Sequence, residues 1–138
     1  MSSLHTQVGG SHYKTMKMQP VQFAMENNWD FCASSTLKYI IRHAGKAGKQ
    51  DLEKAIHFSE LRADLVRGIH ARGIPAVDME MFIAINEITD PSTCKALRAL
   101  SKWVYAPREN VYSAFGRGYF EPLVAAIKDM IHDHYPVY

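Results

Sequence analysis

The chain has 138 residues, enough for an ordinary hydrophobic core, so we expect a single domain over residues 1–138. Hydrophobic residues make up 47% of the sequence and charged residues 22%, a balance that excludes an intrinsically disordered chain. The formal net charge of +2 is too small to indicate a nucleic-acid or membrane partner by itself. No apolar run resembles a signal peptide or a membrane span, so we expect no membrane partner and a cytoplasmic location.

The basic residues are distributed unevenly along the chain. Residues 1–73 carry ten Lys and Arg against six Asp and Glu, a net of +4, whereas residues 74–138 carry six against eight, a net of −2. Such a surplus is expected if the N-terminal half holds an anionic ligand. The two cysteines, Cys32 and Cys94, are too few for a disulfide framework and are interpreted as reduced thiols.

Apolar periodicity, caps and glycine stops predict an all-α fold, because no segment alternates convincingly at the period of a β-strand. Residues 1–19 are polar and are expected to form a tail or an ordered arm. The expected helices cover residues 20–28, 31–44, 49–67, about 76–88, a segment opened by Asp90-Pro91, and about 120–134. The sequence shows no internal repeat. The aromatic side chains between Tyr105 and Tyr119 are expected to pack in the core or between subunits, which favours a homo-oligomer.

Helices 31–44 and 49–67 are expected to form a central antiparallel hairpin. Asp30 suits the N-cap of the first helix, and Gly45 suits its C-terminal stop. Only a short turn ending at Gly48 separates the two helices, so they must pack side by side in opposite directions.

Basic side chains gather at the closed end of this hairpin. Lys38 and Arg42 are spaced i and i+4 on one helix face, Lys46 lies in the turn, and Lys54 lies one turn into the next helix. Like charges repel one another unless an anion lies among them, and the first N–H groups of a helix favour an anion. The spacing alone slightly favours side chains that extend into water, so both interpretations stay open at this point.

Motifs in the first half of the chain resemble those of a known family. The segments GGSHYK, MQPVQFAMENNWDFC and LKYIIRHAGKAGKQDLEKAIHF keep the order and spacing of a small family of tailed-phage proteins over about residues 10–66. That family includes short nucleotide kinases, without a P-loop, that phosphorylate deoxynucleoside monophosphates. The matching residues are His12, Tyr13, Lys14, Gln19, Pro20, Phe23, Lys38, Tyr39, Arg42, Lys46, Gly48, Asp51, Leu52, Lys54 and Ala55.

The resemblance implies a nucleotide and phosphate site within residues 10–67 and leaves residues 74–138 as a C-terminal helical extension with no assigned role. Lys38, Arg42 and Lys54 would be catalytic by neutralising the transferred phosphoryl group, with Arg42 as a bidentate clamp. The residues expected to bind the phosphates or the nucleotide are His12, Tyr13, Lys14, Tyr39, Lys46 and Asp51. For Asp51, the ordinary role of an acidic residue in a first helical turn is an equal alternative.

The chain departs from the family pattern at Ser34-Ser35, where family members usually carry Gly-Asn. If this dipeptide admits a nucleotide close to the helix backbone, serine side chains could obstruct the nucleotide or supply hydroxyl contacts to it. This departure leaves open which substrate the protein binds and whether it turns that substrate over.

Other nucleotide and metal sites are disfavoured. The chain has no G-x-x-x-x-G-K-[ST] motif, which excludes an ordinary P-loop kinase. His132-Asp133-His134 lacks further ligand motifs, so no metal site is predicted. Glu60 and Asp64 are too few acids for the magnesium cluster of an all-α nucleoside triphosphate pyrophosphatase.

The favoured function is therefore a phage-type nucleotide kinase that acts on deoxynucleoside monophosphates with a nucleoside triphosphate donor. No resident cofactor is assigned, and magnesium would enter only with the triphosphate. The alternative is a non-catalytic protein that sequesters a nucleotide or binds and inhibits a host protein, and nucleic-acid binding is a weaker alternative. The expected partners are a nucleotide and further copies of the chain, in the host cytoplasm if the protein is of phage origin.

Overall fold

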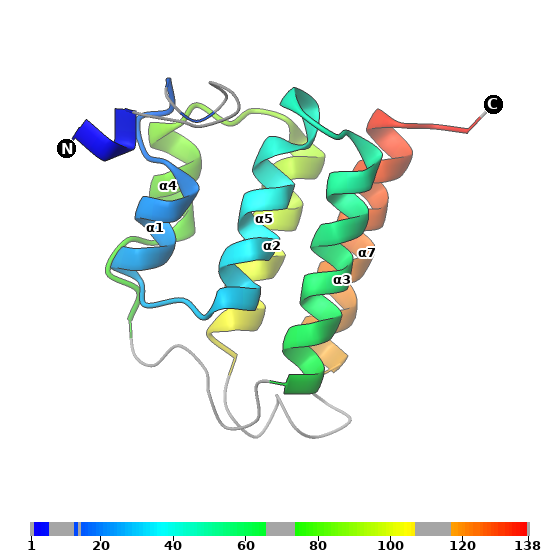
Figure 1. Ribbon diagram of the computed structural model, residues 1–138. Coiled ribbons are helices and arrows are strands. Elements are labelled where there is room, and N and C mark those ends of the chain that lie inside the picture. The colour runs from blue at the N-terminus through cyan, green and yellow to red at the C-terminus, as the bar shows by residue number, and fades with distance from the viewer. Residues whose placement is uncertain (1, 6–12, 14, 66–73, 107–116, 138) are drawn as a thin grey trace.

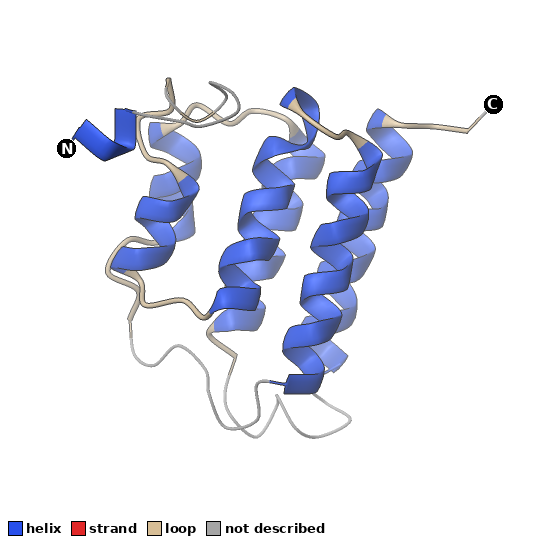
Figure 2. Cartoon of the chain, in the orientation of Figure 1, coloured by secondary structure: helices blue, strands red, loops and turns tan. Residues whose placement is uncertain are grey.

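The computed structural model describes residues 2–5, 13, 15–65, 74–106 and 117–137 (Figure 1). Within these residues the chain is all-helical, which confirms the predicted fold class (Figure 2). The helices are η1 (Ser2–His5), α1 (Pro20–Glu26), α2 (Phe31–Arg42), η2 (His43–Gly45), α3 (Lys49–Leu65), α4 (Met79–Ile85), α5 (Pro91–Val104) and α7 (Arg117–His134). None of them is both long enough and apolar enough to cross a membrane.

The helix starts follow from capping residues in the sequence. Asp30, Asp78 and Asp90 are the N-caps of α2, α4 and α5, and each carboxylate accepts a backbone N–H of the first turn. Several boundaries differ from the prediction. Helix α2 ends at Arg42 rather than at residue 44, and α4 covers Met79–Ile85 rather than about residues 76–88. Helix α1 ends before Asn28, whose φ of 54° is left-handed, and α7 begins at residue 117 rather than 120, with Pro122 inside its length.

The α-helices of the described residues form two layers (Figure 1). Helices α1, α2 and α3 lie in the front layer, and α4, α5 and α7 lie behind them, each running opposite to its partner in front. Contacts join α2 to α3 and α5 to α7 within the layers, and α2 to α5 and α3 to α7 between them. The predicted hairpin thus supplies two of the three helices of the front layer and is backed by helices from the second half of the chain.

The rear layer repeats the front layer, although the sequence shows no repeat. Helices α1 and α4 are each seven residues long, and each ends at an asparagine, Asn27 or Asn86, with φ near −90° and ψ of 0°. The next residue in each case, Asn28 or Glu87, has a φ of 54°. In each layer the short helix is followed by a medium one and then by a long one: α1, α2 and α3 in front, and α4, α5 and α7 behind.

A reciprocal pair of side-chain contacts shows how the two layers are related. The amide of Asn27 donates to the carbonyl of Val77 and accepts the N–H of Val77, at 2.8 and 2.9 Å. The amide of Asn86 makes the same two contacts with Met18, at 2.8 and 3.0 Å. The asparagine of each layer thus binds the backbone of the other layer at the equivalent position. Such reciprocal contacts are those of an approximate twofold axis between the two layers.

The hydrophobic core lies between the two layers and takes side chains from both. The rings of Phe23 and Phe82, which occupy equivalent positions in α1 and α4, meet with centroids 4.9 Å apart. Large side chains that are fully buried come from α2, α3, α5 and α7 alike: Leu37, Ile40, Leu52, Leu97, Leu100, Leu123, Ile127 and Met130. The two layers therefore share one core.

Candidate functional site

Three of the predicted cations surround the ring of Tyr39. The Nζ atom of Lys38 lies 4.4 Å from the ring centroid, Cζ of Arg42 lies 4.6 Å away, and Nζ of Lys54 lies 5.5 Å away. Helix α2 supplies the first two and α3 supplies the third, as the hairpin geometry requires. Tyr39 also stacks on Phe58 of α3, with ring centroids 5.7 Å apart, so the ring that the cations approach is held in place.

Arg42 is fixed by Asp51. The carboxylate of Asp51 is fully buried. One of its oxygens accepts a hydrogen bond from Nη2 of Arg42 at 3.1 Å, and the other accepts one from the backbone N–H of Ala47 at 3.0 Å. Burial opposes the charge of Arg42, but the hydrogen bond and charge of Asp51 outweigh that effect and keep the pKa of Arg42 above its usual value. The Nε atom of Arg42 is buried and makes no hydrogen bond within the described residues. The structure thus joins Asp51 to Arg42 and to the turn between the helices.

The remaining predicted residues are placed differently. Lys46 is exposed in the turn between the helices. Gly48, in the same turn, has a φ of 63°, and a Cβ atom there would meet the ring of Tyr135 at 3.3 Å. His12 and Lys14 lie outside the described residues.

Tyr13 brings the N-terminal segment against the hairpin. Its hydroxyl donates to the carbonyl of Lys38 at 3.3 Å. Burial raises the pKa of Tyr13 to about 12, with Arg42 opposing that rise and Asp51 adding to it. Tyr13 therefore lies beside the Arg42–Asp51 pair.

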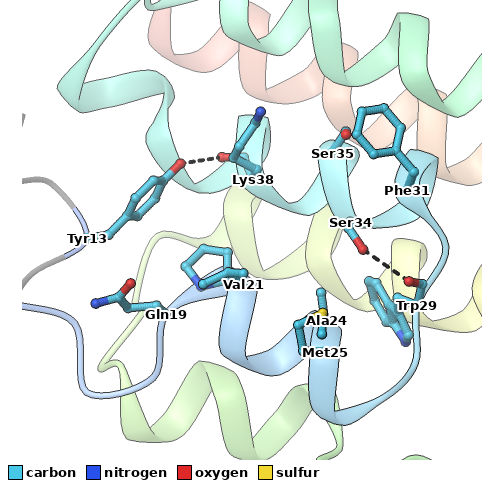
Figure 3. Close-up of a pocket in the computed structure, with 11 residues that line it drawn as sticks. Tyr13, Gln19, Val21, Ala24, Met25, Trp29, Phe31, Ser34, Ser35 and Lys38 are labelled. Atoms are coloured by element: carbon cyan, nitrogen blue, oxygen red, sulfur yellow. Dashed lines mark hydrogen bonds between the residues drawn. The ribbon is translucent and has the colours of Figure 1, made fainter. Parts of the chain in front are cut away.

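A pocket of about 340 Å³ adjoins the cations, between α1 and α2 (Figure 3). Its rim includes three exposed apolar side chains, Val21, Met25 and Phe31, with exposed fractions of 56%, 72% and 75%. The full lining consists of Tyr13, Gln19, Pro20, Val21, Ala24, Met25, Trp29, Phe31, Ser34, Ser35 and Lys38. Pockets of this size and apolar character are typical of small-molecule sites.

The Ser34-Ser35 dipeptide lies in this pocket. The hydroxyl of Ser34 donates to the carbonyl of Asp30 at 2.7 Å, so its proton is already engaged. Ser35 is 5% exposed, and its hydroxyl makes no hydrogen bond within the described residues. A ligand in the pocket would find a free hydroxyl at Ser35.

Sequence reasoning identified the cations and the serine dipeptide but missed the pocket that adjoins both. The available signal was helix 20–28, whose apolar residues Val21, Phe23 and Met25 cannot all face one core. Phe23 is fully buried, whereas Val21 and Met25 point to the pocket rim.

Among the described residues, no group of three or more His, Cys, Asp or Glu side chains could hold a metal ion. His134 instead contacts Asp90, the N-cap of α5, through Nε2 at 2.9 Å. Hydrogen bonds from Thr93, His134 and Ser92 keep the pKa of Asp90 well below its usual value, although burial raises it. His134 and Asp90 thus join the end of α7 to the start of α5.

Residues 8–60, under half of the chain, match a protein family described as a protein of unknown function (DUF3310). The matched segment overlaps most of the segment that carries the motifs, from the N-terminal arm through the first part of α3. No curated protein and no solved structure matches the chain. The family description states no activity, so the chemical interpretation depends on the geometry of the site.

Proposed function

We propose that this protein binds a nucleotide at the junction of α1, α2 and α3 and acts as a nucleotide kinase on deoxynucleoside monophosphates. The observation that carries the proposal is the position of Lys38. Its side chain lines the apolar pocket, and its ammonium group lies with Arg42 and Lys54 around Tyr39. One residue thus links a cavity suited to a base with a group of cations suited to phosphates.

The pocket and the cations complement the two halves of a nucleotide. A base in the pocket would cover the exposed apolar surface of Met25 and Phe31, which is favourable by about 25 cal/mol per Å². The free hydroxyl of Ser35 could hydrogen-bond to a ring nitrogen or a carbonyl of the base. The phosphates would extend toward Lys38, Arg42 and Lys54, where charge-assisted hydrogen bonds are strongest.

Phosphoryl transfer at this site requires positioning and charge neutralisation rather than a protein nucleophile. An oxygen of the bound monophosphate attacks the γ-phosphorus of the donor, the bond to the β–γ bridging oxygen breaks, and two diphosphates leave. Arg42, held by Asp51, and the ammonium groups of Lys38 and Lys54 would neutralise the equatorial oxygens. Mg²⁺ bound to the triphosphate would supply further neutralisation.

A second candidate, a protein that binds the nucleotide without turnover, is favoured by the state of Asp51. Within the described residues, Asp51 is the carboxylate that contacts the cations, and both of its oxygens are engaged. It is therefore not free to orient the attacking phosphate or to accept a proton. A binder would need only the pocket and the cations.

The test combines titration calorimetry of nucleoside mono- and triphosphates with an assay for diphosphate formation. Lys38→Ala and Lys54→Ala should each weaken nucleotide affinity about tenfold, whereas Lys128→Ala, an exposed cation on α7, should have no effect. Diphosphate formation that these variants reduce in parallel supports the kinase. Tight binding without diphosphate supports the binder, and unchanged affinity in both lysine variants refutes the site.

A further inference from the structure

The rear layer contains a second groove lined by basic side chains. It lies between α5 and α7 and has a volume of about 660 Å³. Its lining consists of Lys95, Arg98, Ala99, Lys102, Gly118, Tyr119 and Pro122, which include three cations and no carboxylate. Neither the motifs nor the family match, which ends at residue 60, extends to this groove.

The twofold relation of the layers places this groove at the position equivalent to the Tyr39 cations. Counted from the N-cap aspartates Asp30 and Asp90, Lys38 corresponds to Arg98 and Arg42 corresponds to Lys102. The long helices α3 and α7 align through a reciprocal pair of contacts: Arg62 contacts Asp30 and Trp103, and His134 contacts the equivalent residues Asp90 and His43. In this register the buried residues Asp51 and Ala55 of α3 correspond to the buried residues Leu123 and Ile127 of α7.

The same alignment explains why the second location is hollow. Ala99 stands where α2 has Tyr39, so the aromatic ring that fills the first location is missing from the second. Leu123 stands where α3 has Asp51, so the buried carboxylate that neutralises Arg42 has no counterpart. The groove is therefore more open than the front site around Tyr39, and among the described residues no buried carboxylate neutralises its cations.

The charges around the groove leave it electropositive. Lys95 pairs with Asp129 at 3.2 Å and Arg98 pairs with Glu80 at 2.6 Å, and these four side chains are between 49% and 67% exposed. Exposed pairs of this kind contribute little and exchange readily with other anions. Lys102 is exposed and makes no ion pair within the described part of the chain. A concave surface lined by positive charges concentrates small anions.

We propose that this groove binds the diphosphate group of a small ligand, at a site separate from the front pocket. Lys95, Arg98 and Lys102 lie along one face of α5, which suits two linked phosphates better than a single one. Tyr119 of α7 lines the opposite wall. The ligand is either a nucleoside di- or triphosphate or inorganic pyrophosphate, since both present the same group. The proposal does not depend on catalysis at the front site.

The test measures pyrophosphate binding by titration calorimetry at low ionic strength, using the full chain with Lys38→Ala and Lys54→Ala to weaken the front site. In that background, Lys102→Ala should lower the affinity about tenfold, and Ala99→Tyr, which restores the ring of the front layer, should abolish binding. Lys128→Ala, an exposed cation outside the groove, should leave it unchanged. Because Lys102 is exposed, its loss does not threaten the fold.

Comparison of ligands then identifies the source of the diphosphate. Tighter binding of ATP than of pyrophosphate indicates a nucleotide, and equal binding indicates the inorganic ion. The proposal is refuted if the background variant binds no pyrophosphate, if neither groove variant changes the affinity, or if only an RNA oligonucleotide binds. If the unaltered chain binds no nucleotide at the front site while pyrophosphate binding at the groove is intact, the proposed function alone is refuted.

Discussion

Asp51 and Arg42 form the most deeply buried ion pair at the candidate site, and one of the two partners carries the proposed chemistry. The side chain of Asp51 is fully buried and that of Arg42 is 16% exposed. A buried charge that loses its partner is costly, because water cannot replace the lost contact. The same contact that positions Arg42 for phosphate thus also holds the turn between α2 and α3.

Asp51→Ala is expected to lower the free energy of unfolding by about 3–5 kcal/mol, because it leaves Arg42 without a counter-ion and the N–H of Ala47 without an acceptor. Asp51→Asn should cost less, since an amide oxygen still accepts a hydrogen bond. Urea unfolding measures both. Asp129→Ala, which breaks the exposed pair with Lys95, is the matched control and should change stability by less than about 1 kcal/mol. Equal effects at Asp51 and Asp129 would contradict the role given to burial.

Tyr13 should make stability fall at alkaline pH. Its pKa in the folded protein is about 12, above its usual value of 10.0, mainly because of burial. Between these two values the unfolded chain loses the proton while the folded chain keeps it, so stability is full below pH 10 and falls as the pH rises toward 12. Tyr13→Phe should reduce this fall, as measured by urea unfolding at several pH values. An identical alkaline profile in the variant would contradict the burial of the hydroxyl.

At the scale of residues, the sequence predicted which side chains lie close together better than it predicted which of them form hydrogen bonds or ion pairs. The i and i+4 spacing of Lys38 and Arg42 was enough to place them together. Local spacing could not reveal that Asp51 would turn both of its oxygens toward Arg42 and the turn. The pocket residues of α1 were also missed, because their role depends on which side of a short helix is left uncovered by the rest of the chain.

At the scale of elements, Asp30 joins three helices. It caps α2 by accepting the N–H of Ala33 at 2.8 Å, and its other oxygen accepts Nε of Arg62 from α3 at 2.8 Å. The guanidinium of Arg62 in turn lies 4.5 Å from the ring centroid of Trp103 in α5. Arg62 is only 2% exposed, so Asp30 is the partner that makes its burial tolerable.

Asp30→Ala should therefore destabilise the protein far more than the loss of an ordinary cap. We expect about 3–5 kcal/mol, against about 1 kcal/mol for Asp78→Ala, whose carboxylate caps α4 in an exposed position. Thermal and urea unfolding of both variants provide the comparison. If the two substitutions cost the same, Asp30 acts only as a cap and the contact with Arg62 contributes nothing.

Element boundaries were predictable where capping chemistry is local. Asp30 and Asp90-Pro91 marked helix starts correctly, because a cap acts within one turn. The start of α7 was placed three residues late, since Gly118 and Pro122 are both poor helix formers in isolation. Packing of α7 against α5 and α3 outweighs that local preference.

At the scale of the whole molecule, the shared core implies that the motif-bearing half does not fold alone. Leu37 and Leu52 of the front layer are buried in the same core as Leu97 and Leu123 of the rear layer. A fragment of residues 1–67 should therefore show no cooperative thermal transition by circular dichroism, whereas the full chain should show one. A folded monomeric fragment, established by sedimentation, would contradict this prediction.

The repeat could not be predicted from the sequence because the equivalent positions share burial rather than identity. Asp51 corresponds to Leu123, and Arg62 corresponds to His134. What the two layers keep in common is a pattern of buried and exposed positions together with the asparagine at the end of each short helix. Many residue types satisfy such a pattern, so the similarity becomes visible only when the helices are seen in space.

The approximate twofold axis has a consequence for how such a protein can change over time. In a symmetric dimer of identical chains, every substitution appears in both halves, so a gain at one site is also imposed on its copy. Here the two halves are encoded separately and can specialise independently. Tyr39 and Ala99 illustrate this freedom: one half has a ring among its cations, and the other has a small side chain and open space at the equivalent position.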